Sequence, residues 1–116
     1  MDILEQSDAD IRKVAETIWG DMVNGANSRD WDIYSQHMLA ESVTEQARAS
    51  VEHQWQYSKM FTSLTEEREF MGVLRQMDHV LVLWKQWSTK VEGDFLVMLY
   101  LKSIEEDVKV IGSWIR

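Results

Sequence analysis

The chain has 116 residues, which suits one domain with one core, and 45% of them are hydrophobic, which is too many for a disordered protein. Its formal net charge of −8 repels phosphate backbones, and its lysines form no basic cluster, so nucleic-acid binding is disfavoured. It has no apolar run of the roughly 18 residues that a membrane span needs, no signal-peptide layout at its start and no cysteine. We therefore expect a cytoplasmic protein with no membrane role.

The first half of the chain has the apolar spacing of helices. We expect a first helix that begins at Ser7 or Asp8, either of which can cap its start, and that stops at Asn24-Gly25. Its inner side is an apolar stripe with helical periodicity, made of Ile11, Val14, Ala15, Ile18, Trp19, Met22 and Val23. We expect about residues 1–7 to be loosely ordered and residues 1–116 to form a single domain.

Two more helices should follow the first. The second is short and should be capped by Asn27 or Ser28, with Trp31, Tyr34 and Met38 on one side. The third has the clearest start, because Ser42-Val43-Thr44-Glu45 matches a capping box. Its inner side is predicted to carry Ala47, Val51, Trp55 and Phe61, with Tyr57, Met60 and Leu64 beside them.

The second half predicts an antiparallel meander. Its strands are expected at about 68–77, 80–89, 94–104 and 108–115. The turns are expected at Asp78-His79, Val91-Glu92-Gly93-Asp94 and Ile104-Glu105-Glu106-Asp107. The sequence therefore predicts an α+β fold in which three N-terminal helices pack on a curved antiparallel sheet.

The strand segments 80–84 and 95–101 are almost continuously apolar, which is typical of a sheet covered on both faces. Pairing across the turns separates the two faces. The face expected to meet the helices carries Val82, Trp84, Val97, Leu99, Leu101, Ile111 and Ile115, with Gln86 and Ser113 among them. The outer face carries Leu83, Lys85, Trp87, Met98, Tyr100, Lys102, Val110 and Trp114.

Three helices can cover only one face of such a sheet, so the other face needs a partner. The simplest partner is a second copy of the chain, and we expect a homodimer through the outer sheet face. Aromatic and methionine side chains mixed with basic ones suit an interface, which makes Lys85, Trp87, Met98, Tyr100 and Trp114 the interface candidates.

The order of three helices and a curved meander, with the strand sequences Val80-Leu81-Val82-Leu83-Trp84 and Val110-Ile111-Gly112-Ser113-Trp114-Ile115, resembles the nuclear transport factor 2-like superfamily. Asn27-Ser28-Arg29-Asp30-Trp31 is similar to that family's second-helix start, and the likeness spans nearly the whole chain. The resemblance implies a cone-shaped, cystatin-like roll with a pocket between helices and concave sheet, often in a sheet-to-sheet dimer. This sequence departs from many members by running almost directly from the second helix into the third, without their short hairpin at the pocket mouth.

The family does not imply one function, because its members include isomerases, dehydratases, SnoaL-type cyclases, epoxide hydrolases and non-enzymatic domains. No Gly-rich phosphate loop, HExxH sequence or nucleophile elbow is present. The histidines His37, His53 and His79 lie on separate predicted segments without ligand spacing, so we expect no metal and no cofactor.

Polar and aromatic side chains at six positions are expected to face the pocket: Trp19, Tyr34, His53, Tyr57, Gln86 and Ser113. His53 and Tyr57 stand one helical turn apart and could touch. Each position also has a structural alternative. Trp19 fits core packing, Gln86 and Ser113 fit hydrogen bonding within the sheet, and His53 fits a surface or core position.

Two functions from different classes fit these features. The first is a domain that binds a small apolar or aromatic molecule in an apolar pocket, with a SnoaL-like isomerase, cyclase or dehydratase as its catalytic form. That catalytic form requires a carboxylate, histidine or lysine deep in the pocket. The second is a non-catalytic dimerisation or protein-interaction domain, which a closed core without a cavity would favour.

Overall fold

The first helix, α1 (Asp8–Ser28), begins where the sequence predicts, and Ser7, one of the two expected caps, is its N-cap. In the computed structural model, which describes residues 2–116, the Ser7 side chain accepts a hydrogen bond from the Asp10 N–H at 3.1 Å. Most of the predicted apolar stripe is buried, namely Ile11, Ala15, Ile18, Trp19, Met22 and Val23. The cap and the stripe together set where α1 starts and which side of it faces the sheet.

The predicted stop at Asn24-Gly25 is wrong, because α1 continues to Ser28 and ends at Arg29 in the left-handed conformation (φ 55°). Gly25 allows a close approach instead. A Cβ atom at this position would lie 2.5 Å from the backbone nitrogen of Tyr34, so only glycine lets the next helix pack this tightly. The Gly25 carbonyl also accepts a hydrogen bond from the Asp30 N–H at 2.8 Å, which turns the chain back along α1.

The second helix, α2 (Trp31–Ser35), is capped by the Asp30 side chain, which accepts a hydrogen bond from the backbone inside the helix. The predicted caps Asn27 and Ser28 are wrong, because both residues lie in the last turn of α1. Asn27 binds the start of the sheet instead. Its side chain donates to the Leu64 carbonyl and accepts from the Leu64 N–H, both at 2.9 Å.

After a 3-10 turn, η2 (Ala40–Ser42), comes the third helix, α3 (Glu45–Tyr57). The predicted capping box is wrong, because its cap residue Ser42 belongs to η2 and its Glu45 is the first residue of the helix. Thr44 provides the cap, because its side chain accepts a hydrogen bond from the N–H three residues later. Trp55 is buried, as expected of the inner side of this helix. Phe61 is also buried, but it belongs to the loop that follows α3 rather than to the helix.

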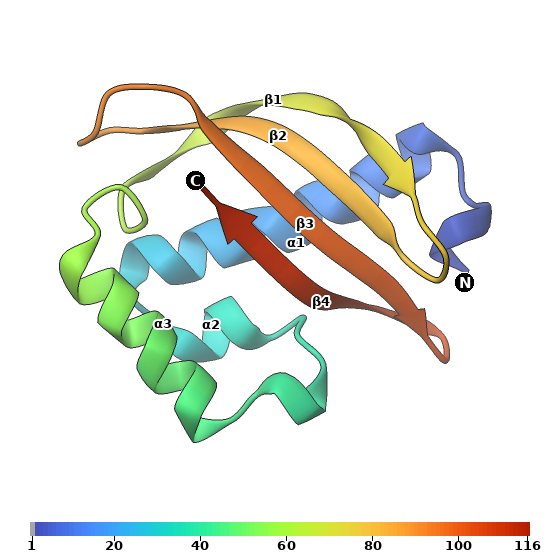
Figure 1. The fold of residues 1–116 in the computed structure, drawn as a ribbon, viewed down its shortest axis with the longest axis horizontal. Coiled ribbons are helices and arrows are strands. Elements are labelled where there is room, and N and C mark those ends of the chain that lie inside the picture. The colour runs from blue at the N-terminus through green and yellow to red at the C-terminus, as the bar shows by residue number, and fades with distance from the viewer. Residues whose placement is uncertain (1) are drawn as a thin grey trace.

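Four antiparallel strands form a meander in the spatial order β1-β2-β3-β4 (Figure 1). Their bounds are β1 (Leu64–Arg75), β2 (Val80–Ser88), β3 (Phe95–Ile104) and β4 (Asp107–Ile115). The first strand starts earlier than predicted, whereas the other three lie within one residue of the prediction. Gly93 adopts φ 116° in the turn between β2 and β3, a conformation that favours glycine.

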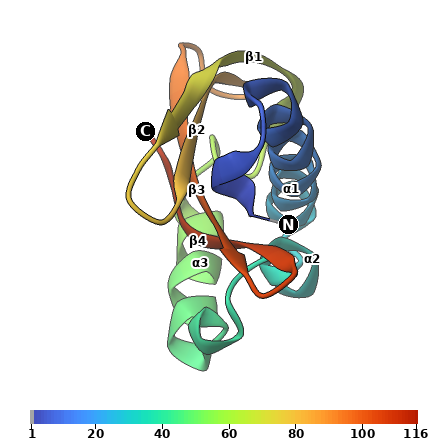
Figure 2. The same cartoon turned by 90° about the vertical axis from the view of Figure 1, so that its right-hand side faces the viewer.

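The sheet is curved, and the helices lie on its inner side (Figures 1 and 2). Helix α1 packs across this face and contacts both β1 and β3. Among residues 2–116, no helix covers the outer face (Figure 2). The fold is therefore α+β, with three helices packed on a curved antiparallel sheet, as predicted. None of the described helices is both long enough and apolar enough to cross a membrane.

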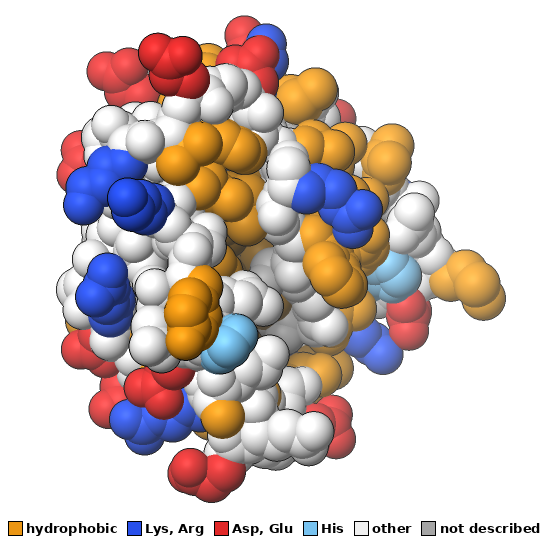
Figure 3. Space-filling view, turned by 60° about the vertical axis from the view of Figure 1, so that its left-hand side comes forward, with side chains coloured by type: hydrophobic (Ala, Val, Ile, Leu, Met, Phe, Trp, Pro, Cys, Tyr) orange, Lys and Arg blue, Asp and Glu red, His pale blue; other side chains and the backbone are white. Residues whose placement is uncertain are grey.

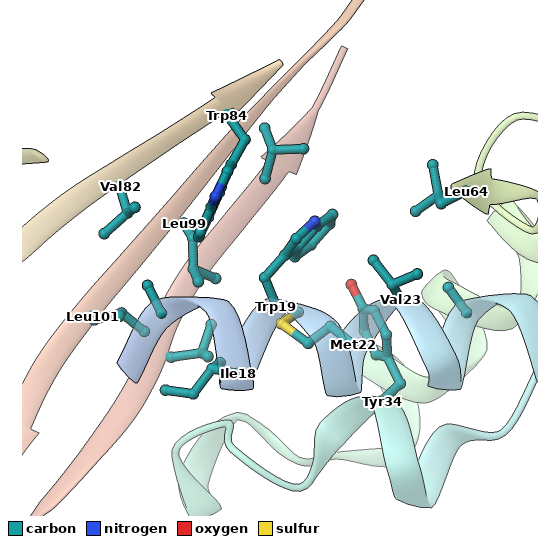
Figure 4. Packing of buried hydrophobic residues seen from close by; sticks show 14 of the residues in the cluster. Ile18, Trp19, Met22, Val23, Tyr34, Leu64, Val82, Trp84, Leu99 and Leu101 are labelled. Carbon is teal, nitrogen blue, oxygen red and sulfur yellow. The ribbon is translucent and has the colours of Figure 1, made fainter. Parts of the chain in front are cut away.

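Two tryptophans join α1 to the sheet (Figure 4). The rings of Trp19 and Trp84 are stacked, with centroids 6.3 Å apart. The Trp19 indole N–H donates to Gln86 Oε1 at 3.1 Å, and the Trp84 indole N–H donates to Glu16 Oε1 at 2.7 Å. Glu16 Oε2 also accepts a hydrogen bond from Arg68 Nε at 3.1 Å. The indoles of Trp19 and Trp84 thus each have a polar partner on the opposite layer.

A β-bulge in β4 changes the predicted faces of two residues. The register passes from the Leu101–Val110 pair to the Tyr100–Gly112 pair, which leaves Ile111 as an extra residue. Val110 was predicted on the outer face, but it is buried in the core. Ile111 was predicted on the inner face, but it is 37% exposed. The residues beyond the bulge alternate between the faces as predicted.

The segment after α2 covers part of the free edge of β4. The Val110 N–H donates to the His37 carbonyl at 2.8 Å, and the Val110 carbonyl accepts from the Leu39 N–H at 3.4 Å. Met38, between these two residues, forms a parallel bridge with Val110. The edge therefore has an extended segment beside it at one position.

Residues 1–7, which were expected to be loosely ordered, contain a 3-10 turn, η1 (Ile3–Glu5). Ile3 is fully buried, and its N–H donates to Ser103 Oγ at 2.8 Å. Met1 lies outside the described residues. This turn thus packs against β3.

The contact between α1 and α2 can be tested with a pair of glycine variants. Gly25→Ala should lower the free energy of unfolding by about 1–3 kcal/mol, because the new Cβ atom collides with rigid backbone. Gly20→Ala, also in α1, should raise it by about 0.5–1 kcal/mol, because there the Cβ atom meets only the Arg68 guanidinium at 3.5 Å. Urea unfolding followed by tryptophan fluorescence measures both, and equal effects of the two substitutions would contradict the close approach.

Candidate functional site

A cavity of about 490 Å³ opens between α3 and β4. Its wall combines residues from all three helices, their connecting loops and the second half of β4. The lining residues are Trp19, Tyr34, Met38, Ser42, Val51, Gln54, Phe61, Val110, Ile111, Gly112, Ser113, Trp114 and Ile115. Figure 3 views this side of the molecule and shows a hollow bordered by hydrophobic side chains.

Three of the predicted pocket residues, Trp19, Tyr34 and Ser113, line this cavity. They come from α1, α2 and β4, so the fold brings together side chains that are far apart in the sequence. Ser113 lies opposite the buried Leu99 in the register, which places it on the inner face as predicted. The other three candidates, His53, Tyr57 and Gln86, are not part of this wall.

Gln86 is fully buried but is not part of the cavity wall. Its Oε1 accepts the hydrogen bond from Trp19, and its Nε2 donates to the carbonyls of Thr65 at 2.8 Å and Trp87 at 3.0 Å. The amide nitrogen and the amide oxygen of Gln86 are therefore both engaged inside the protein. Gln86 supports the site indirectly, because it fixes the orientation of Trp19.

His53 and Tyr57 line a second, more open hollow of about 330 Å³ rather than the main cavity. Their ring centroids are 4.7 Å apart, so the predicted contact between them is confirmed. Tyr57 is 70% exposed. The two hollows share Gln54, Phe61 and Ile115, which means that they adjoin at the end of α3.

Tyr34 is the titratable side chain of the cavity wall. It is buried, and it rises from α2 beside Met22 and Val23 (Figure 4). Burial raises the pKa of Tyr34 above its ordinary value of 10.0, and the Ser113 hydroxyl lowers this pKa by a smaller amount. At neutral pH the tyrosine therefore keeps its proton and can donate a hydrogen bond.

The rest of the wall carries no charge. Among the described residues, the cavity lining includes no aspartate, glutamate, histidine, lysine or arginine. Besides the indole N–H groups of Trp19 and Trp114, its side-chain polar groups are the hydroxyls of Tyr34, Ser42 and Ser113 and the amide of Gln54, set among apolar and aromatic surfaces. Such a wall suits a neutral molecule, because a charged one would be desolvated without a partner.

Sequence reasoning missed several wall residues for identifiable reasons. Val51 and Phe61 were assigned to the inner side of the third helix, without a pocket role. Gln54 was overlooked, although it stands three residues after Val51 and so lies on the same side of α3. Ile111 and Gly112 reach the cavity at the bulge, and Gly112, a glycine inside a strand pattern, was the sequence signal that was missed.

Other titratable pairs lie outside the cavity. His37 Nε2 lies 2.7 Å from Asp21 Oδ2. In the turn between β1 and β2, hydrogen bonds from His79 and Lys102 lower the pKa of the exposed Asp78. Within residues 2–116, no group of three or more His, Cys, Asp or Glu side chains is placed to hold a metal ion.

The five interface candidates lie together on the outer sheet face, as the register requires: Lys85, Trp87, Met98, Tyr100 and Trp114. Trp114 is 58% exposed, and the other four are partly buried by their neighbours. Met98 pairs with Trp114 across β3 and β4, near the middle of this face. An apolar patch with basic side chains within it therefore faces away from the helices.

A scan against protein-family models finds no match to this chain, and a search of the curated proteins finds none either. The chemistry of the cavity wall and of the outer face is therefore the basis for assigning a function.

The raised pKa of Tyr34 predicts how stability changes at high pH. Because this pKa is higher in the folded chain than in the unfolded one, the contribution of Tyr34 to stability is complete below pH 10 and is lost as the pH rises through the folded-state pKa. Tyr34→Phe should therefore lose less stability than the wild type between about pH 9 and pH 11.

Urea unfolding at a series of pH values measures this difference. Tyr57→Phe, at an exposed position, is the matched control, and it should leave the contribution of Tyr34 in place. If the Tyr34 and Tyr57 variants gave the same pH dependence, the buried hydroxyl would not be the cause.

Proposed function

We propose that this protein binds an uncharged, largely apolar small molecule in the cavity between α3 and β4. The observation that carries the proposal is the wall itself, in which four neutral polar side chains stand among aromatic and aliphatic ones. Ligand sites are commonly cavities of this size, apolar for the most part and with a few polar groups that orient the ligand. The cavity also counts against a domain whose only role is assembly, because such a domain needs no open space in its core.

Binding without chemical conversion fits the wall better than catalysis. A SnoaL-like isomerase, cyclase or dehydratase needs a group that exchanges a proton with the substrate near neutral pH. The titratable group of the described wall is Tyr34, and its raised pKa keeps it protonated. It can orient a ligand oxygen by donating a hydrogen bond, but it is a poor base.

The arrangement of elements supports a second part of the proposal, that the chain is a member of the nuclear transport factor 2-like superfamily. Three helices precede a curved meander, and the cavity lies between the two layers. In place of the hairpin that many members have after the second helix, this chain has the edge segment at His37–Leu39 and the turn η2. We further propose a cytoplasmic location, in keeping with an acidic chain without cysteine.

The binding proposal can be tested with N-phenyl-1-naphthylamine, a neutral probe whose fluorescence rises in apolar surroundings. The wild-type protein should bind it, and Val51→Trp should weaken binding at least tenfold, because the larger side chain fills the cavity. Val43→Trp is the matched control, since Val43 is 41% exposed and is not part of the wall. Absence of binding to the wild type, or equal effects of the two substitutions, would refute the proposal.

The outer sheet face supports a further proposal, a homodimer. Trp114 and Met98 lie on this face without a covering helix, and Lys85 lies among them. Exposed apolar patches of this kind are typical of interaction sites. A second copy of the chain would cover the patch by placing two outer faces together, since a two-fold axis pairs identical surfaces.

Met98→Lys should convert the dimer to a monomer, because it places a charge near the middle of the patch, opposite Leu83. Met77→Lys is the matched control, since Met77 is 98% exposed in the turn between β1 and β2. Sedimentation equilibrium at micromolar concentration should give twice the chain mass for the wild type and the control, and the mass of a single chain for Met98→Lys. A wild-type monomer would overturn the dimer and would leave the ligand proposal unaffected.

A further inference from the structure

The cavity meets β4 at its edge rather than on one face only. Its wall includes every residue from Val110 to Ile115. Ser113 and Ile115 belong to the inner face of the sheet, whereas Gly112 and Trp114 belong to the outer face. Side chains from both faces of one strand can line the same cavity only where the cavity runs along the edge of that strand.

The register shows which backbone groups point into this space. Leu96 and Arg116 exchange two hydrogen bonds, at 2.8 and 3.1 Å, so they form a hydrogen-bonded pair of the ladder. Such pairs recur at every second residue of an antiparallel ladder, so Trp114 and Gly112 also bond to β3. The N–H and C=O groups of Ser113 and Ile115 must therefore point away from β3, and no other backbone segment among the described residues pairs with them.

One part of the β4 edge is already paired with an extended segment of the same chain. Val110 is the preceding residue whose backbone points away from β3, and it binds the extended segment His37–Leu39 through both its N–H and its C=O. That pairing stops at Val110, and the cavity continues along the edge beyond it. Beyond Val110, the N–H and C=O groups of Ser113 and Ile115 face the cavity, two residues apart as in any strand edge.

We propose that the ligand of this cavity is an extended peptide segment with uncharged side chains, which adds to the β4 edge by pairing with the backbone of Ser113 and Ile115. This inference rests on the proposed ligand site and names the class of molecule that occupies it. An amide chain is the ligand that offers donors and acceptors in the same alternation as the strand edge. At about 3.3 Å per residue, pairing with both residues requires about three residues of peptide. Because the described wall carries no charged side chain, charged peptide side chains are disfavoured.

Amide hydrogen exchange tests the pairing directly. In the free protein, the amides of Gly112 and Trp114 should exchange slowly, and those of Ser113 and Ile115 should exchange fast. Saturation with the probe peptide acetyl-Ser-Val-Phe-Val-Ser-amide should slow exchange at Ser113 and Ile115 at least tenfold and leave Gly112 and Trp114 as they were. Peptide binding without this alternating protection would overturn the inference.

A pair of variants provides an independent measurement. Ser113→Pro removes the outward N–H without removing a bond to β3, and it should weaken binding of the probe peptide at least tenfold. Ser113→Ala keeps the N–H, and it should bind the peptide within about threefold of the wild type. Both variants should keep the far-ultraviolet circular dichroism of the wild type, which reports an intact fold. Should Ser113→Pro fail to fold, the exchange experiment decides.

The two probes separate failure of this inference from failure of the proposed function. If the wild type binds the naphthylamine but not the peptide, the peptide inference is wrong and the cavity remains a site for another neutral ligand. If it binds neither, the proposed function fails as well. Equal affinity of the Ser113→Pro and Ser113→Ala variants for the peptide would also refute backbone pairing.

Discussion

Two indole N–H groups join the helical layer to the sheet, and the position of the cavity depends on them. Trp19 of α1 donates to Gln86 of β2, while Trp84 of β2 donates to Glu16 of α1. A buried indole N–H without a partner would be costly, so each bond limits how far the helix can slide or rotate on the sheet. Because Trp19 also lines the cavity, the same contacts that fix the core fix one wall of the site. The rest of the cavity wall comes from α2, α3, β4 and the loops, which pack around Trp19.

The distribution of charge separates the site from the rest of the surface. The chain has 20 acidic and 12 basic residues, yet none of them lies in the described cavity wall. The ion pair between Glu16 and Arg68 lies outside the cavity wall, where Glu16 also accepts a hydrogen bond from Trp84. A neutral ligand would therefore experience a local environment unlike the acidic exterior. The outer sheet face is different again, since it mixes lysines with large apolar side chains.

Much of the fold could be predicted from the sequence, because its signals are local. The cap at Ser7, the helical stripe of α1 and the near-continuous apolar runs of β2 and β3 each follow from neighbouring residues. Gly25 was misread, since glycine near a helix end is usually a stop. Its actual purpose is a contact with Tyr34, which depends on tertiary packing. A similar limit applies to Gln86, whose burial beside Trp19 could not be distinguished from a pocket position by strand alternation alone.

The candidate site could be predicted only in part, for a related reason. Trp19, Tyr34 and Ser113 followed from the expected faces of their elements, and all three line the cavity. His53 and Tyr57 were also expected to face the pocket, but both side chains are exposed in the last turns of α3 and line the adjoining hollow instead. The role of the β4 edge was missed, because Gly112 inside the strand indicates a bulge but does not say which residue is extra or how the alternation changes beyond it.

The bulge at Ile111 also has a consequence for how this chain can vary in length. Ile111 has no partner on β3, because Val110 pairs with Leu101 and Gly112 pairs with the adjacent Tyr100. A chain shorter by that residue would keep every backbone pair on both sides and would lose only the local bend beside the cavity. Insertions and deletions among evolutionary relatives should therefore be tolerated at this point inside a strand, where they are ordinarily excluded. The shape of the cavity could then change between lineages without disturbing the core.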